Sequence, residues 1–352
     1  MPTVRAAAFL FPCLLVACNS IGPSTISRDR FDYSAAMSDS WKRQALLNVV
    51  KLRYMDPPVF VEVGQIVAGY TLESGLNAGA DISGGGSSGQ VTGGSLGGSV
   101  KFTDRPTITY TPMTGNKFVR ALMTPLPPAA VFSTIAAGWP AERVLGAALT
   151  SINGLQNLHI GVDNYSAADP DFQRALRLLR DIQRSGEISM RVLKKDEAQS
   201  NVVVIRHRTT PEIAAEGAEL RRLLKLDPDV SELQLSFASA AQSPTELAVT
   251  TRSVLHIMQV MAAGVDVPEQ EVAEGRATPG LPVGEESGRL VRIRCGDEAP
   301  ADAFVAVRYR GRDYWVDDRD LDSKRAFAFM MMLFTLSDPG GEENGPSLTI
   351  PI

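Results

Sequence analysis

Hydrophobic and polar residues alternate over an unusually long stretch of this chain, from residue 66 to residue 103. Alternation with a period of two places successive side chains on opposite faces of a β-strand. A glycine- and serine-rich tip, Ser83 to Gly94, divides the stretch into an outgoing and a returning strand. The pattern predicts one long amphipathic β-hairpin. Its apolar positions are Ile66, Ala68, Tyr70, Leu72, Leu76, Ala78, Ala80 and Ile82 on the outgoing strand and Leu96, Val100 and Phe102 on the returning strand.

These apolar positions form a candidate surface that faces either a membrane or a partner. Strands of about 9 to 11 residues with one apolar face can cross a bilayer, and one hairpin per subunit could line a pore only in a ring of subunits. The simpler interpretation is a Gly-rich loop or a long soluble hairpin that packs on a neighbour. It is favoured because Ser74, Gly94 and Gly98 interrupt the apolar face, and aromatic residues there are limited to Tyr70 and Phe102.

A helix with one apolar face is predicted ahead of the hairpin, from about Ser34 to Tyr54. Apolar residues recur there at steps of three and four. The segment Asp56-Pro57-Pro58 should end the helix, because proline cannot continue it. A half-buried strand is then predicted from Val59 to Val63, and Gly64 interrupts its alternation. The apolar helix positions are Met37, Trp41, Ala45, Val49 and Leu52.

Helices and strands alternate in the rest of the chain. Short helices are predicted at residues 128–137 and 141–151, and a buried helix at 326–336. Three further helices are predicted to begin where a capping residue precedes proline, namely at Asp169-Pro170, Thr210-Pro211 and Ser243-Pro244. The last should run to Gly264, with Glu246 completing a capping box. Strands are predicted at residues 188–192, 202–205, 233–237 and 291–295, and a hairpin around Gly311.

This order of elements predicts a mixed α/β fold, with an N-terminal helix and long hairpin followed by a C-terminal α/β sandwich. The predicted division is a signal peptide at residues 1–17, a lipidated tether at 18–33, an N-terminal module at 34–164, an α/β domain at 165–338 and a tail at 339–352.

The N-terminus has the pattern of a bacterial lipoprotein signal. Arg5 precedes an apolar run, and Leu15-Val16-Ala17-Cys18 fits the lipobox at all four positions. We expect cleavage before Cys18 and acylation of its thiol, with palmitate among the acyl chains, which anchors the protein by burying many CH₂ groups. The alternative is an ordinary cleaved signal peptide. The run is too short for a membrane span, and Asn19 favours the outer membrane, facing the periplasm.

Three segments of the first third to half of the chain resemble a family of uncharacterised bacterial lipoproteins. They are ISRDRFDYSAAMSDSWK, NVVKLRYMDPPVF and DRPTITYTPMTGNKF. The resemblance implies an envelope location and an N-terminal module of helix and sheet. It transfers no functional residue to this chain.

Composition and charge narrow the possible partners. The chain has 352 residues, of which 44% are hydrophobic and 21% charged, so it should fold. Its net charge of −5 becomes −6 once Arg5 is removed, which argues against a nucleic-acid partner. Cys295 is the one thiol left after cleavage and acylation, so no internal disulfide is expected, and its alternation with Val291 and Ile293 predicts a buried position.

Residues with catalytic or metal-binding chemistry form no recognisable motif. No pair among His159, His207 and His256 has metal-ligand spacing, and His256 is expected on a solvated helix face. The carboxylates between Asp317 and Asp320 favour a turn that caps the next helix over a Ca²⁺ site. We therefore predict no cofactor, no metal and no catalytic residue.

The resulting hypothesis is a lipid-anchored envelope protein that acts as a scaffold, binding protein or assembly factor at the periplasmic face of a membrane, without catalysis. Its partners would be membrane lipid, through Cys18, and another protein or further copies of itself. One alternative is a subunit of an oligomeric outer-membrane channel that contributes one hairpin per protomer. Another is an unrecognised periplasmic hydrolase.

Overall fold

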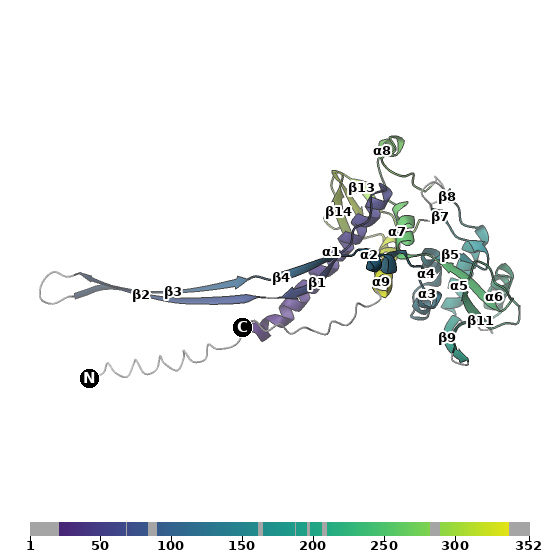
Figure 1. Ribbon diagram of the computed structural model, residues 1–352, viewed down its shortest axis with the longest axis horizontal. Coiled ribbons are helices and arrows are strands. Elements are labelled where there is room, and N and C mark those ends of the chain that lie inside the picture. Colours follow the sequence, from purple (N-terminus) through teal and green to yellow (C-terminus); the bar gives the residue numbers. More distant parts are fainter. Residues whose placement is uncertain are drawn as a thin grey trace. The chain divides into compact units, whose positions relative to one another are not determined.

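The computed structural model describes residues 21–67, 69–83, 90–160, 165–186, 188–195, 198–205, 210–281 and 289–337 (Figure 1). The chain forms two compact units. The first comprises the residues up to Ser40 together with Phe60–Pro112, and the second comprises Trp41–Val59 and the residues from Met113 onward. The predicted mixed α/β class is confirmed.

The first helix, α1 (Ile21–Arg53), begins well before the predicted start at Ser34. The segment predicted as a tether is therefore helical from Ile21. Pro23 lies in the first turn, where a missing backbone N–H costs nothing, and no proline or glycine follows before Arg53. The helix ends as predicted, because Met55 takes a left-handed backbone conformation, with φ of 58°, immediately before the Asp56-Pro57-Pro58 segment.

The predicted hairpin is confirmed, but its first strand begins at Tyr70 rather than at Ile66. Strand β2 (Tyr70–Ser83) pairs antiparallel with β3 (Gln90–Asp104), and β1 (Val61–Val67) pairs antiparallel with β4 (Thr107–Pro112) (Figure 1). The amide of Arg105 donates to the carbonyl of Gly69 over 2.9 Å, which links the two pairs. A bulge between Val63 and Gln65 coincides with the break in alternation at Gly64.

A six-stranded sheet is the centre of the second unit, in the order β6-β5-β12-β11-β10-β9. Strands β11 and β12 are parallel, and the other described neighbours are antiparallel. The predicted boundary at residue 164 falls between strands of this one sheet. The strands are β5 (Leu149–Ile152), β6 (Leu155–Gln156), β9 (Ile188–Lys195), β10 (Ala198–Ile205), β11 (Glu232–Phe237) and β12 (Glu246–Thr251).

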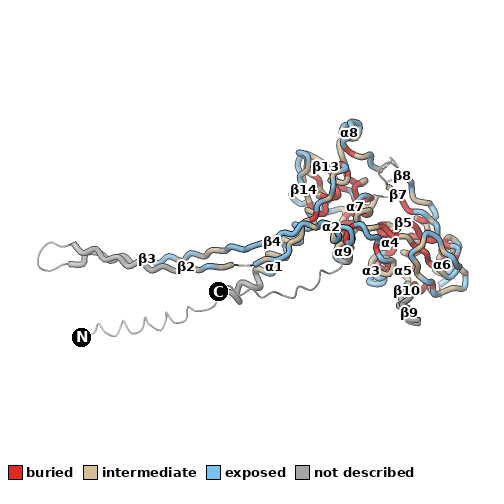
Figure 2. The backbone as a smooth tube through the Cα atoms, viewed as in Figure 1, coloured by how far each residue is buried: buried red, intermediate tan, exposed pale blue. Residues whose placement is uncertain are grey.

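Four helices pack on this sheet or on one another: α3 (Pro128–Ala136), α4 (Ala141–Ala148), α5 (Pro170–Arg184) and α6 (Pro211–Leu223). The starts of α5 and α6 confirm the predictions from Asp169-Pro170 and Thr210-Pro211. Helix α5 buries one apolar face that includes Phe172, Leu176 and Ile182. Buried positions of this unit lie in the sheet and its covering helices, and also in the last part of α1 and near the C-terminus, for example at Val49, Tyr314 and Phe327 (Figure 2).

Two helix predictions are wrong. Residues 149–151, predicted as the end of a helix, lie in β5. The predicted helix from Ser243 to Gly264 is strand β12 followed by α7 (Val254–Ala262). Thr250 and Thr251 favour a strand because their β-branched side chains lose rotamer freedom in a helix. The Glu246 carboxylate instead accepts from the amide of Gln242 over 2.7 Å, within a turn.

The remaining elements belong to the second unit. The predicted hairpin around Gly311 is confirmed within a three-stranded sheet of order β13-β15-β14. The predicted C-terminal helix is confirmed as α9 (Leu321–Ser337). The others are α2 (Gly115–Phe118), the π-helix η2 (Val119–Met123), β7 (His159–Ile160), β8 (Tyr165–Ser166), α8 (Glu269–Ala273), β13 (Arg294–Gly296), β14 (Val305–Tyr309) and β15 (Arg312–Val316).

Candidate functional site

The β2 and β3 hairpin, called the ribbon below, carries most of the predicted surface positions. Ile66 lies in β1, opposite Ile108, and Ala68 lies outside the described residues. In the ribbon the register places even-numbered positions opposite even-numbered ones, because Leu72 pairs with Phe102 and Ala78 with Leu96. A bulge after Asp81 shifts the pairing at Ile82. The backbone therefore places Tyr70, Leu72, Leu76, Ala78, Ala80, Leu96, Val100 and Phe102 on one face.

The opposite face of the ribbon carries charge. Glu73 lies directly opposite Lys101, and their charged atoms are 3.9 Å apart. Both side chains are well exposed, at 64% and 70%, so the pair is a solvated cross-strand contact of small energetic value.

The ribbon forms a sheet of two strands, which are 14 and 15 residues long. In the part of the chain that the structure describes, neither strand pairs with a third, so each has one outer edge of unpaired backbone groups. Isolated two-stranded hairpins are at best marginally stable in water, and free edges are templates for pairing with another chain. The ribbon is therefore the first candidate functional surface.

Cys18, the predicted lipidation site, lies outside the described residues. Within the described ranges, none of the helices combines the length and apolar character that crossing a bilayer requires. Those ranges also contain no cluster of three or more His, Cys, Asp or Glu side chains arranged to hold a metal ion.

A cleft of about 560 Å³ in the second unit is the second candidate site. It lies among α4, α5, α9 and the corner at Gly138-Trp139-Pro140. Trp139 and the buried Phe329 pack in the cleft with ring centroids 5.5 Å apart. We call it the arginine cleft, because its charged lining residues are Arg143, Arg177, Arg289, Arg325 and Glu142.

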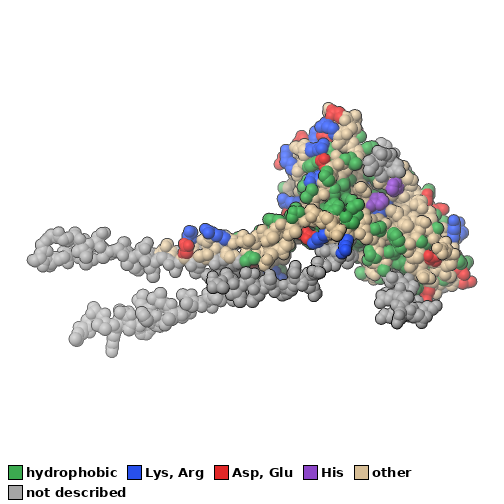
Figure 3. All heavy atoms as spheres, in the orientation of Figure 1, with side chains coloured by type: hydrophobic (Ala, Val, Ile, Leu, Met, Phe, Trp, Pro, Cys, Tyr) green, Lys and Arg blue, Asp and Glu red, His purple; other side chains and the backbone are tan. Residues whose placement is uncertain are grey.

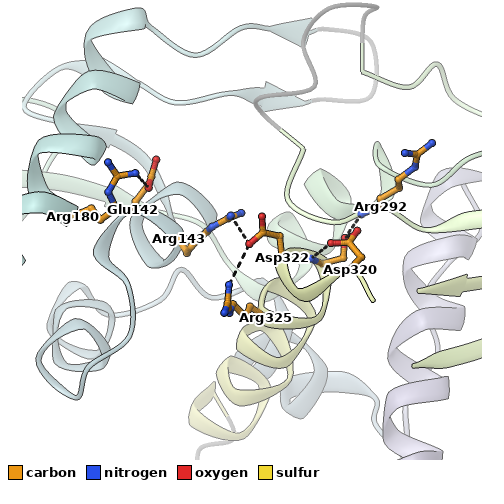
Figure 4. A network of polar contacts seen from close by, with 8 residues as sticks. Glu142, Arg143, Arg180, Arg292, Asp320, Asp322 and Arg325 are labelled. Carbon is orange, nitrogen blue, oxygen red and sulfur yellow. Dashed lines mark hydrogen bonds and ion pairs between the residues drawn. The ribbon is translucent and has the colours of Figure 1, made fainter. Parts of the chain in front are cut away.

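Ion pairs organise the wall of the arginine cleft (Figure 4). Asp322, on α9, pairs with Arg143 from α4 at 2.7 Å and with Arg325 at 3.5 Å. Glu142 pairs with Arg180 at 2.8 Å. Arg180 also donates to Asp181, and this hydrogen bond lowers the pKa of the Asp181 carboxyl. Among the residues that line the cleft, four are arginines and one is a glutamate, so guanidinium groups outnumber carboxylates there.

The carboxylates near α9 behave as the turn interpretation predicts. The Oδ1 atom of Asp320 accepts from the amide of Ser323 over 3.0 Å, which caps the start of α9. Asp317 accepts from the amide of Arg319 over 3.0 Å and pairs with Arg294 at 3.3 Å. These contacts give both carboxylates hydrogen-bond or ion-pair partners.

His256 is half-buried, so the prediction that it lies on a solvated face is wrong. Its ring lies edge-on to His159, with centroids 5.8 Å apart, and histidine side chains lie together on the visible face in Figure 3. Burial, followed by the positive charge of Arg252, lowers the pKa of His256 to about 4. The imidazole is therefore neutral at physiological pH. His207 lies outside the described residues.

Cys295, which is half-buried rather than fully buried, lies near two buried tyrosines, Tyr54 and Tyr314. The hydroxyl of Tyr54 donates to the carboxylate of Glu271 over 2.5 Å and lies 2.6 Å from the hydroxyl of Tyr314. Burial raises the pKa of Tyr54 to about 12 and also raises the pKa of the Cys295 thiol. A thiol with a raised pKa is a poor nucleophile at neutral pH.

Comparison of the chain with protein-family models, curated proteins and solved structures gave no match. The resemblance to uncharacterised lipoproteins therefore stays a prediction. The arginine cleft could not be predicted from the sequence, because its lining residues are spread from Ala137 to Phe329 and no linear spacing marks them.

Proposed function

We propose that this protein is a lipid-anchored assembly protein of the bacterial envelope, and that its copies associate through the ribbon. The observation that carries this proposal is the pairing of β2 and β3 with each other alone among the described strands. A ribbon with two free edges gains stability when another strand pairs with each edge.

A second copy of the same ribbon is the partner that fits best. The strands are nearly equal in length, so the β2 edge of one copy can pair along its whole length with the β3 edge of the next. This contact is head-to-tail, and repetition of a head-to-tail contact gives a ring when the rotation closes. It would also bring the apolar even-numbered positions of neighbouring copies onto one continuous face.

The lipid on Cys18 supports this proposal by concentrating the copies on one membrane surface. Tethering raises the effective concentration of one ribbon near another, so weak edge pairing can become stable association. An anchored protein that associates with further copies of itself can act as a scaffold or assembly factor. This function requires no catalytic group.

The test is the mass of the lipidated protein in detergent, measured by light scattering, for two matched pairs of variants. Leu76→Asp and Leu96→Asp add charge to the even-numbered face. Asn77→Asp and Ser95→Asp add the same charge to the odd-numbered face. We expect an oligomer in the wild type and in the odd-face variants and a monomer in the even-face variants. A wild-type monomer, or equal behaviour of all four variants, would contradict the proposal.

An oligomeric channel is the second candidate function, and the length of the ribbon favours it. Strands of 14 and 15 residues exceed the about 9 to 11 residues that a membrane-crossing strand needs. We expect discrete conductance steps from the lipidated protein in planar bilayers if the ribbons insert. An oligomer without conductance would leave the assembly function and remove the channel. The hydrolase alternative stays a prediction that none of the contacts above favours.

A further inference from the structure

We propose that the arginine cleft binds an amphiphilic organic anion, in which an apolar or aromatic body carries a carboxylate, sulfonate or phosphate group. The cleft lies wholly within the second unit and contains no residue of the ribbon. Binding here and association through the ribbon are therefore separate properties.

The charge of the cleft selects an anion. Its lining carries four arginines and one glutamate, a formal charge of +3, in a chain whose net charge is −5. Glu142 is already paired with Arg180, so it does not neutralise the lining arginines. Arg143 and Arg325 share the single carboxylate of Asp322, which leaves positive charge at this wall (Figure 4).

Arg177 is the residue best placed to receive the anionic group. It is exposed and lies on α5, one turn after Gln173, which also lines the cleft. Among the contacts of the described residues, Arg177 forms no ion pair. A guanidinium group offers two parallel N–H donors that match the oxygens of a carboxylate, sulfonate or phosphate.

The floor of the cleft selects an apolar body. Phe172, Leu158 and Phe329 are buried, and the indole of Trp139 lies against Phe329 at an interplanar angle of 48°. A volume of about 560 Å³ falls in the range of small-molecule sites, about 300 to 1,000 Å³. An inorganic anion would leave these aromatic groups uncovered, whereas an amphiphilic anion would contact the floor and the arginines together.

Two fluorescent probes that differ by one sulfonate group test the proposal on the full-length protein. They are 8-anilinonaphthalene-1-sulfonate and the neutral N-phenyl-1-naphthylamine. We expect the sulfonate to bind about tenfold more tightly, which corresponds to one charge-assisted contact, and its affinity to fall with added salt. Equal affinities for the two probes, or tighter binding of the neutral probe, would overturn the proposal.

Substitutions inside and outside the arginine cleft test whether the probes bind there. Arg177→Gln and Arg325→Gln should each weaken sulfonate binding about five- to tenfold and leave binding of the neutral probe unchanged. Ala326→Trp should weaken the binding of both probes, because the larger side chain would fill the cleft. The control is Arg184→Gln, which removes the same charge from α5 outside the cleft and should bind like the wild type. Circular dichroism confirms that each variant is folded. The location of the site in the arginine cleft would be contradicted if Arg184→Gln lost as much affinity for the sulfonate probe as Arg177→Gln. It would also be contradicted if neither Arg177→Gln nor Arg325→Gln lost affinity.

Discussion

At the scale of single residues, Arg252 holds together two walls of the arginine cleft. Its side chain is 1% exposed, and its guanidinium donates to the backbone carbonyls of Gly146, Ala147 and Leu158, which all line the cleft. Burial lowers its pKa to about 10, so it stays charged at neutral pH. The hydrogen bonds of Arg252 all go to carbonyl groups. The stability of its buried charge therefore depends on donor N–H groups that point toward all three of these oxygens.

This geometry predicts a large cost for Arg252→Lys. Lysine keeps the charge, but its single nitrogen cannot reach three carbonyls that a planar guanidinium spans. We expect the free energy of unfolding to fall by about 2 to 4 kcal/mol, measured by urea denaturation. Arg143→Lys, at an exposed ion pair, is the control and should change stability by less than about 1 kcal/mol. Equal effects of the two substitutions would show that the carbonyl contacts of Arg252 contribute little.

His256 predicts a pH dependence of stability. Its pKa is about 4 in the folded protein, against 6.5 for a free histidine, so the unfolded chain binds a proton between these values that the folded protein does not. Stability is therefore full above pH 6.5 and falls as the pH drops toward 4. After discounting for solvent screening at this half-buried site, the loss is about 1 to 2 kcal/mol.

The measurement is the urea midpoint of the wild type and of His256→Gln at pH 7.5 and pH 4.5. The variant should lose less stability between these two values than the wild type, because glutamine does not titrate. His159→Gln removes the neighbouring ring and serves as the matched control. A wild type and a His256→Gln variant that lose equal stability would rule out His256 as the source.

At the scale of elements, Ser253 and Ser243 are expected to contribute differently to stability. Ser253 precedes α7, and its hydroxyl accepts from the amide of His256 over 3.2 Å, which caps the helix. Ser243, which the sequence pattern marks as the cap, lies in a turn before β12. We expect Ser253→Ala to cost about 1 kcal/mol and Ser243→Ala to cost less than half of that, in chemical denaturation. The reverse order would mean that the turn at Ser243 stabilises the fold more than the cap does.

The difference between these serines shows what local sequence could predict. Capping residues before Pro170 and Pro211 correctly marked the starts of α5 and α6. The same signal before Pro244 failed because the following residues pair between β5 and β11, and this long-range pairing outweighs a local helix start. The local signal therefore predicted α5 and α6 correctly, whereas β12, whose pairing involves distant strands, was mistaken for a helix.

A turn signal that is not among the predictions above lies at Asn153-Gly154. Both residues have positive φ, 44° and 88°, and they join β5 to β6 as a two-residue turn. The Asn153 side chain also donates to the carbonyl of Leu224 over 2.8 Å and accepts from the amide of Ala248 over 2.7 Å. The Asn-Gly dipeptide could have marked the end of α4 and the strand that follows. Its contacts with Leu224 and Ala248 could not have been found from sequence.

At the scale of the whole molecule, the chain combines two parts with different requirements. The second unit has a buried core of its own, which includes Leu145, Ile152 and Phe172. The ribbon, in contrast, has only two strands. A two-stranded sheet cannot bury a core by itself, so a ribbon of this length is only marginally stable unless another strand pairs with it. The alternation of hydrophobic and polar residues was enough to predict the ribbon. The pairing of its two strands with each other alone, among the described strands, could be learned only from the structure.

This contrast predicts that the ribbon can be removed without harm to the second unit. The amide of Arg105 already donates to the carbonyl of Gly69 over 2.9 Å, so a two-residue Asn-Gly turn can replace residues 70–104 and close β1 and β4 into a short hairpin. The shortened protein should unfold within about 2 °C of the wild type in calorimetry, since the core of the second unit is unchanged. It should also keep its preference for the sulfonate probe and lose its self-association. A large fall in unfolding temperature would mean that the ribbon supports the second unit, and an oligomer that survives the deletion would place the contact between copies elsewhere on the chain.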